Sequence, residues 1–196
     1  IRDRLKGKEI DTESELIKII PKTLNGISWK KSMKWSDHNL SWGRPLRSIL
    51  SIYDKKHMKF KYAHLDSVNF TIIEEDAEIK HKKVNDFDGY LKILKQNEII
   101  LDHNKRAKFI TEKILSICKK MSCQELIDQN LLLEVSNLVD KPRIIIAQFD
   151  KRYLKLPKEV IKSTLEFHQK YFTLTDNKNQ IRNDFIIVTN LSLIHI

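Results

Sequence analysis

The sequence has 196 residues, of which 41% are hydrophobic and 32% are charged, with only four Gly and four Pro. A chain of this length buries roughly 70% of the surface that it exposes when unfolded, so it can build a core as one domain or two small ones. This composition excludes a disordered tail, and no apolar run reaches the about 18 to 20 residues that a membrane span needs.

The formal net charge is +10, and the isoelectric point is about 9.5. Such an excess raises the local concentration of polyanions and favours nucleic acid or an acidic surface as the partner. An alternative origin is an AT-rich coding sequence, which favours Lys over Arg and Ile over Val without selection for binding. Charge alone leaves both explanations open.

The first half of the sequence predicts one helix followed by a small sheet. Thr12 and Glu15 have the spacing of a capping box before an apolar stripe, and Pro21 is expected to bend the helix. Two runs with β-branched and aromatic content flank the polar segment DKKH, which predicts a β-hairpin that a third strand extends. The predicted ranges are 11–24 for the helix, 48–53 and 58–65 for the hairpin, and 68–73 for the third strand.

The second half alternates helices and strands irregularly. Pro142 separates a helix end from RIIIAQF, a nearly continuous apolar run typical of a strand covered on both faces, so we expect this strand in mid-sheet. Pro157 is well placed at the first turn of a helix. The predicted helices are 87–94, 105–121, a short one from 124, 131–139 and 158–168, and the predicted strands are 98–101, 143–149, 171–175 and 185–189. We therefore expect an α+β fold, a mixed sheet with flanking helices, in which residues 1–196 form a single domain or a fragment of one.

The two cysteines, Cys118 and Cys123, lie five residues apart in a predicted helical region, so they fall on different faces and match no zinc or redox spacing. We expect reduced packing cysteines, no metal site and a cytoplasmic location, since no export signal is present. The sequence starts at Ile1 and ends in LSLIHI. We interpret it as part of a longer protein and expect residues 191–196 to be a non-native tail.

No Gly-rich phosphate loop, HExxH, GxSxG or paired Cys motif is present, and the seven His and 26 carboxylates are scattered. No catalytic residue is predicted on this basis. Three denser segments remain as candidates for binding.

The first segment is WKKSMKW, from Trp29 to Trp35, followed by Trp42. Its cationic side chains can neutralise phosphates, and its indole rings offer faces on which unpaired bases or a ribose stack. Alternatively, the rings pack in a core and the lysines are only solvated. The candidate RNA-binding residues here are Lys30, Lys31, Lys34, Trp35, Arg44 and Arg47.

The second segment is EVSNLVDKP, from Glu134 to Pro142, where the end of a predicted helix carries a Ser-Asn pair.

The third segment is EFHQKYF, from Glu166 to Phe172, where polar side chains and two aromatic rings meet at a predicted helix-to-strand junction. The alternative for this third segment is that its aromatic rings belong to the core and the rest is a cap. The candidate RNA-binding residues of the third segment are His168, Gln169, Lys170 and Tyr171.

In this order, the segments resemble the N-terminal third of the beta subunit of the bacterial two-subunit glycyl-tRNA synthetase. That family shows PKSMRW leading into RPIRW, then EVTNLVEYP, TMxxHQKYFP and FIxVxN. This chain reads KKSMKW, RPLRS, EVSNLVDKP, STLEFHQKYF and FIIVTN, so the resemblance covers about residues 10–190. Two departures are the lack of a Gly-His-Arg-Phe-like element within SVNFTIIEEDAEIKHKK, and Thr173 in place of a usual Pro.

The resemblance implies an indirect part in catalysis. In the family, the alpha subunit holds the aminoacylation site and uses ATP and Mg²⁺, while the beta subunit binds tRNA and completes the assembly. The implied partners are the alpha subunit and tRNA(Gly) in an α2β2 hetero-oligomer, and this chain is expected to carry no cofactor and to be inactive in isolation. The implied fold resembles the B3/B4 module of the phenylalanyl enzyme.

Two other functions stay open at this point. One is an editing hydrolase that acts on mischarged tRNA, with His168 as the nearest catalytic candidate. The other is a purely structural interaction module, in which the tryptophans and EFHQKYF serve packing alone.

Overall fold

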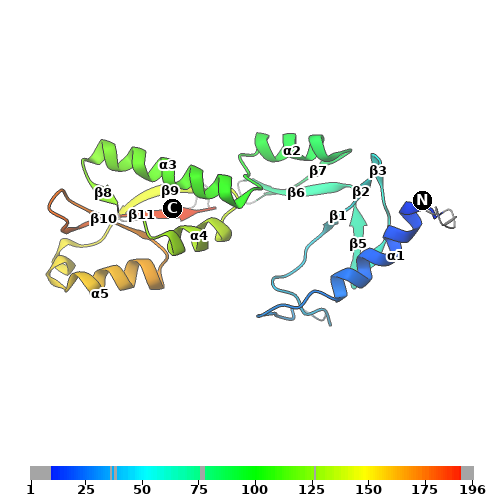
Figure 1. The fold of residues 1–196 in the computed structure, drawn as a ribbon, viewed down its shortest axis with the longest axis horizontal. Helices are drawn as coiled ribbons and strands as arrows, with labels where there is room; N and C mark the ends of the chain where they lie inside the picture. The colour runs from blue at the N-terminus through cyan, green and yellow to red at the C-terminus, as the bar shows by residue number, and fades with distance from the viewer. Residues whose placement is uncertain (1–9, 36, 38, 76–77, 126, 191–196) are drawn as a thin grey trace, which may run out of the picture. The chain divides into compact units, whose positions relative to one another are not determined.

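The computed structural model describes residues 10–35, 37, 39–75, 78–125 and 127–190. It confirms the α+β fold class (Figure 1). The chain forms two compact units, residues 1–93 and 94–196. Helix α2 (Phe87–Gln96), predicted over 87–94, carries the chain from one unit to the other.

Helix α1 (Thr12–Asn25) begins the described part of the first unit. Its N-cap is Asp11, whose carboxylate accepts a hydrogen bond from the amide of Ser14 at 3.0 Å, so the predicted capping role of Thr12 was wrong. Pro21 lies inside the helix. The apolar stripe of α1 packs on a small core of Met58, Phe60 and Tyr62; the stripe residues are Leu16, Ile17, Ile20 and Leu24.

The observed hairpin differs from the predicted one, because its second strand begins at Lys56, inside the DKKH segment that was expected to form the turn. Strands β2 (Ile52–Tyr53) and β3 (Lys56–His57) pair across a turn with positive φ at Asp54 and Lys55. The predicted strand over 58–65 is interrupted, because Ala63 has a φ of 51° and turns the chain between two strands. A three-stranded sheet has the order β1-β5-β4, with β1 and β5 parallel; the strands are β1 (Ile49–Leu50), β4 (Lys61–Tyr62) and β5 (Leu65–Val68).

The predicted third strand joins a different partner. Strand β6 (Phe70–Glu75) pairs antiparallel with β7 (Glu78–Lys83) in a separate two-stranded sheet, so it does not extend the hairpin. The polar sequence EIKHKK of β7 lacks the apolar alternation that marks a half-buried strand, and it was therefore missed.

The second unit is a four-stranded antiparallel sheet between helices. Its strand order is β8-β10-β11-β9. The strands are β8 (Gln124–Glu125), β9 (Arg143–Gln148), β10 (Phe172–Thr175) and β11 (Ile181–Thr189). One face packs on α3 (His103–Met121) and α4 (Gln129–Leu138), and the other on α5 (Lys158–Lys162) and a π-helical turn, Ser163–His168. A short 3₁₀ helix, η1 (Lys151–Lys155), precedes α5, and Figure 1 shows α3 and α5 on opposite sides of the strands.

Each face of this sheet has its own core. Side chains alternate along the strands, so Phe172, Leu174 and Ile186 face α3 and α4, whereas Phe185 faces α5. Both cysteines, Cys118 and Cys123, are buried in the larger core and form no disulfide with each other; helix α3 ends before the second of them.

Three predictions in this unit were wrong. The strand RIIIAQF lies at an edge of the described sheet, where β9 pairs with β11 alone, and FIIVT in β11 takes an interior place. Residues 98–101 form no strand, and the chain from Gln124 is strand rather than helix. These assignments depend on partners far along the chain, since β8 pairs with β10 across about 50 residues.

The start of α3 predicts a pH-dependent local stability. Asp102 accepts hydrogen bonds from the amides of Lys105 and Asn104, and these bonds lower the pKa of its carboxyl group. A lowered folded-state pKa means that the cap stabilises the helix above the unfolded value of about 3.9 and loses this effect as the pH falls through the folded-state pKa. We expect amide-exchange protection in the first turn of α3 to fall between pH 5 and pH 3.

The control for this prediction is Asp102→Asn, which keeps the capping oxygen and removes the titrating group. Hydrogen exchange of the amides of residues 104–107 in this variant should show a smaller pH dependence than in the parent protein. Equal pH profiles in the two proteins would show that Asp102 does not cause the change.

Candidate nucleic-acid interface

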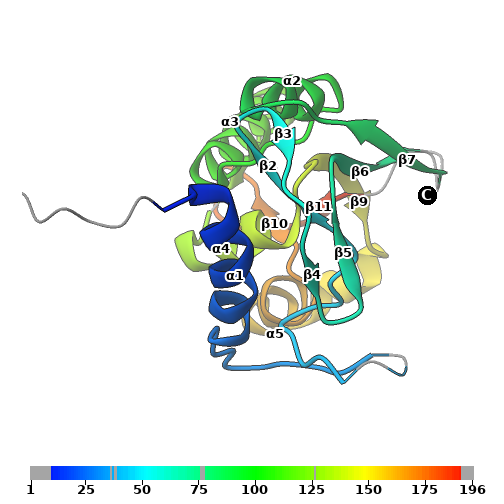
Figure 2. The ribbon, with the colours of Figure 1, turned by 90° about the vertical axis from the view of Figure 1, so that its right-hand side faces the viewer.

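Residues 27–47, here called the basic arm, follow α1 and contain the first candidate segment. Met33 and Trp42 form an antiparallel bridge, with N–H to O distances of 2.9 and 3.1 Å in the two directions. Ser41 Oγ donates to Ser32 Oγ at 2.9 Å. Figure 2 shows this segment running out from the end of α1 and folding back on itself. The arm is therefore held as a hairpin-like loop.

The three tryptophans of the arm take different positions. Trp42 is half-buried, with its ring 5.9 Å from that of Tyr62 in the core, as the packing alternative expected. Trp35 is also half-buried and lies edge-on to His64, with ring centroids 6.1 Å apart. Trp29 keeps 41% of its surface exposed. Only the tertiary structure separates the packed rings from the accessible one.

The cationic side chains of the arm are accessible. Lys30, Lys31, Lys34 and Arg44 are exposed, and none of them forms an ion pair with a carboxylate in the described part of the chain. Arg47 Nη1 lies 3.9 Å from Glu74 Oε2, an exposed pair that leaves its charge largely solvated. With five Lys and Arg and one acidic residue, Asp37, the arm has a net charge of +4. It can attract a polyanion.

The second unit holds the EFHQKYF segment at the junction of the π-helical turn and β10. Lys170 has a φ of 60°, which turns the chain, and its Nζ lies 2.9 Å from Glu134 Oε2. The same Nζ lies 5.2 Å from the ring centroid of Phe167. Since Glu134 opens EVSNLVDKP, this ion pair joins the second and third candidate segments, and it balances the charge of Lys170.

The neighbours of Lys170 differ in accessibility. His168 and Gln169 are exposed, and the imidazole lies edge-on to the Phe167 ring with 5.1 Å between centroids. Tyr171 is half-buried and stacks on Phe185 at 5.2 Å, within the core under α5. His168 and Gln169 are thus the most accessible of these candidates, and a role for them in RNA binding stays a prediction.

Two further contacts involve residues that sequence reasoning did not select. Asn190 ends FIIVTN, and its Oδ1 accepts hydrogen bonds from the amides of Asp140 and Lys141 at 3.0 and 3.1 Å. Arg106 of α3 donates to the carbonyl of Ser136 near the end of α4. The segments EVSNLVDKP and FIIVTN therefore meet at the α4–β9 turn.

A buried polar cluster lies between β9 and β11. Asp184 is 4% exposed, and both Nε and Nη2 of Arg182 donate to its Oδ2, at 2.8 and 2.6 Å. Gln148 Nε2 donates to Oδ1 at 2.6 Å. The hydrogen bond to Asp184 raises the pKa of Arg182, although burial opposes this. With its partners this close, Asp184 holds the two strands together.

Metal ligands and membrane spans were searched over the ranges that the structure describes. There, no group of three His, Cys, Asp or Glu side chains gathers in a way that would hold a metal ion. None of the helices in these ranges combines the length and apolar character needed to cross a membrane.

Comparison with known proteins identifies the family. A family described as "Glycyl-tRNA synthetase beta subunit" matches residues 3–195. The glycine–tRNA ligase beta subunits of Rickettsia canadensis and Rickettsia akari are each 34% identical over 185 residues, and that of Rickettsia conorii is 35% identical over 188. Each match covers 94% of this chain and 28% of the relative, so the chain spans about a quarter of the relatives' length. The chain belongs to the glycyl-tRNA synthetase beta subunit family.

Proposed function

We propose that this region binds tRNA and supports subunit assembly in a glycine–tRNA ligase whose aminoacylation site lies outside this chain. The observation that carries the proposal is the basic arm, with its net charge of +4 and its exposed lysines. Lysine side chains that neutralise phosphates release counterions from the nucleic acid, and this release drives RNA binding. The family membership supplies the substrate class.

Exposed apolar side chains of the second unit support the assembly role. Phe167 is 69% exposed, Val160 in α5 is 47% exposed, and Leu156, which follows η1, is 46% exposed. Large apolar and aromatic side chains at a surface are typical of protein interfaces. The proposed partner is the alpha subunit, which in this scheme uses ATP and Mg²⁺, in a cytoplasmic hetero-oligomer. We propose no cofactor site in this chain.

The lysines of the arm can be tested directly. In the full-length beta subunit assembled with its alpha subunit, we expect the combined change Lys30→Gln, Lys31→Gln and Lys34→Gln to weaken tRNA(Gly) binding. Each phosphate contact adds up to about 0.9 to the slope of log affinity against log salt, so the slope should become shallower by about 2 to 3. Fluorescence anisotropy at several salt concentrations measures both quantities.

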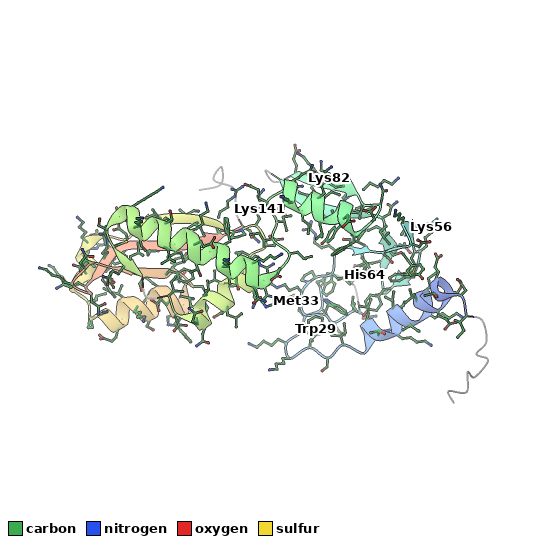
Figure 3. The ribbon with its side chains drawn as sticks, turned by 45° about the horizontal axis from the view of Figure 1, so that its top comes forward. Trp29, Met33, Lys56, His64, Lys82 and Lys141 are labelled. Carbon is green, nitrogen blue, oxygen red and sulfur yellow. The ribbon has the colours of Figure 1, made fainter. Side chains whose placement is uncertain are left out.

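The matched control replaces three exposed lysines of the same unit that lie outside the arm in the sequence. These are Lys56, Lys59 and Lys61. Figure 3 places Lys56 apart from Trp29 and Met33 of the arm. Changing all three to Gln removes the same charge. The salt slope should then differ from the parent value by less than about 0.9, the contribution of one phosphate contact. Equal losses in the two triple variants would mean that net charge, and not the arm, governs binding.

A further inference from the structure

Trp29 contacts two neighbours within the arm and remains an exposed residue. Gly43 lies against its six-membered ring, so closely that a Cβ on Gly43 would come within 2.8 Å of Trp29 Cε3 and 3.0 Å of Cζ3. The Trp42 ring flanks it, with centroids 4.9 Å apart and planes tilted by 56°. Although these contacts cover part of the indole, 41% of the residue remains exposed. The ring is therefore oriented by its neighbours and accessible to a ligand.

The backbone of the arm fixes this orientation. Trp42, which flanks the ring, is bridged to Met33 by two backbone hydrogen bonds, and Gly43 follows it in the chain. Trp42 is itself anchored on the core through Tyr62. A ring that is positioned before binding loses little conformational freedom when a ligand stacks on it. Figure 3 labels Trp29 and Met33 of the arm.

The charges beside the ring select the class of ligand. Lys30 and Lys31 follow Trp29 directly, Lys34 lies next to the bridge, and Arg44 follows Gly43; all four are exposed. A ligand that satisfies both an apolar ring and several cations must combine a flat π surface with anionic groups, as a nucleotide does. In a duplex both faces of a base are already stacked, so the base must be unpaired to reach the indole.

We propose that Trp29 is a stacking platform for an unpaired nucleotide of the bound RNA, whose flanking phosphates the lysines of the arm contact. The proposal rests on the RNA-binding function proposed above and adds that the arm reads single-stranded RNA in preference to duplex. Trp42 packs against the core, and Trp35 is less exposed than Trp29, so Trp29 is the most accessible of the three rings.

The test uses the full-length beta subunit assembled with its alpha subunit, and two probes: a single-stranded RNA octamer and an RNA duplex of about 20 base pairs. We expect Trp29→Leu to weaken octamer binding about 5- to 150-fold, because stacking of one base on an aromatic ring contributes about 1 to 3 kcal/mol. The affinity for the duplex should stay within about twofold of the parent value. The salt slope should not change, because no phosphate contact is removed. Trp29→Phe should retain part of the octamer affinity.

A second variant keeps the Trp29 side chain but changes the position of its ring. Gly43→Ala introduces a Cβ where the structure leaves 2.8 Å to Trp29 Cε3, so it must displace the indole. We expect octamer binding to weaken in the same direction as with Trp29→Leu, with duplex binding preserved.

The outcomes separate this proposal from the function on which it rests. Unchanged octamer binding in Trp29→Leu overturns the stacking role, and if the lysine variants still weaken tRNA binding, the proposed function stands. Equal losses of octamer and duplex binding also overturn the stacking role, since they show that the Trp29 ring only supports the structure of the arm. Loss of the alpha subunit with RNA binding intact identifies Trp29 as a protein contact and overturns it as well.

Discussion

Arg106→Met is expected to destabilise the second unit by about 3 kcal/mol, because hydrogen bonds from a charged donor contribute about 1.5 to 3 kcal/mol each and their loss leaves carbonyls unsatisfied. The half-buried guanidinium donates to three carbonyl oxygens: Nε to Ser136 at 2.8 Å, and Nη1 to Ile100 and Leu101 at 2.6 and 3.0 Å. Ser136 lies in the last turn of α4, where carbonyls have no partner within the helix.

Hydrogen exchange measures this loss locally. The amides of Ile110 and Ile114, whose side chains are fully buried in the core under α3, should exchange faster in Arg106→Met. The matched control is Lys105→Met at the exposed neighbouring position, for which we expect a change within about 0.5 kcal/mol. Arg106→Lys keeps the charge but cannot reach three carbonyls, so its effect should be intermediate. If Arg106→Met and Lys105→Met behaved alike, the carbonyl contacts would not stabilise the unit.

Arg182→Met is the second large effect that we expect, with a loss of about 3 kcal/mol, since removal of one partner leaves a buried charge uncompensated. The remaining carboxylate, Asp184, is 4% exposed, and among the described residues it would keep the side-chain amide of Gln148 as its donor. Because Gln148 and Asp184 pair across β9 and β11, the loss should appear as faster exchange in both strands.

Two comparisons make this prediction specific. Arg152→Met breaks an Arg–Asp pair of the same sequence spacing, with Asp150, in which both side chains are more than half exposed. It should cost less than about 1 kcal/mol, as surface pairs do. Adding Asp184→Asn to Arg182→Met removes the buried charge and should recover part of the stability. No recovery in the double variant would show that lost packing of Arg182, and not the charge of Asp184, causes the effect.

Elements with a local signal were predicted well from the sequence. The helix expected over 105–121 is observed as α3, His103–Met121. It could be predicted because apolar residues recur every three or four positions along it, and Asp102 caps its start. The same reasoning failed for β8, whose two residues are strand only through their pairing with β10. It also failed for β9, since an apolar run shows that a strand is covered but not which strands lie beside it.

The candidate site divides in the same way. The charge of the basic arm follows from composition and spacing, but the three tryptophans are equivalent at that level. Their difference arises because Trp42 packs on Tyr62 while Gly43 backs Trp29. Likewise, the sequence does not reveal an ion-pair partner for Lys170, because the partner, Glu134, lies 36 positions earlier in the chain.

The sequence by itself therefore determined the ordered segments that identify the family, the α+β class and the basic character of the arm, because each depends on residue types and short-range spacing. The tertiary structure alone decided which tryptophan stays accessible, that Lys170 is paired, and that RIIIAQF lies at a described sheet edge. These outcomes depend on contacts between distant parts of the chain, which local periodicity does not encode.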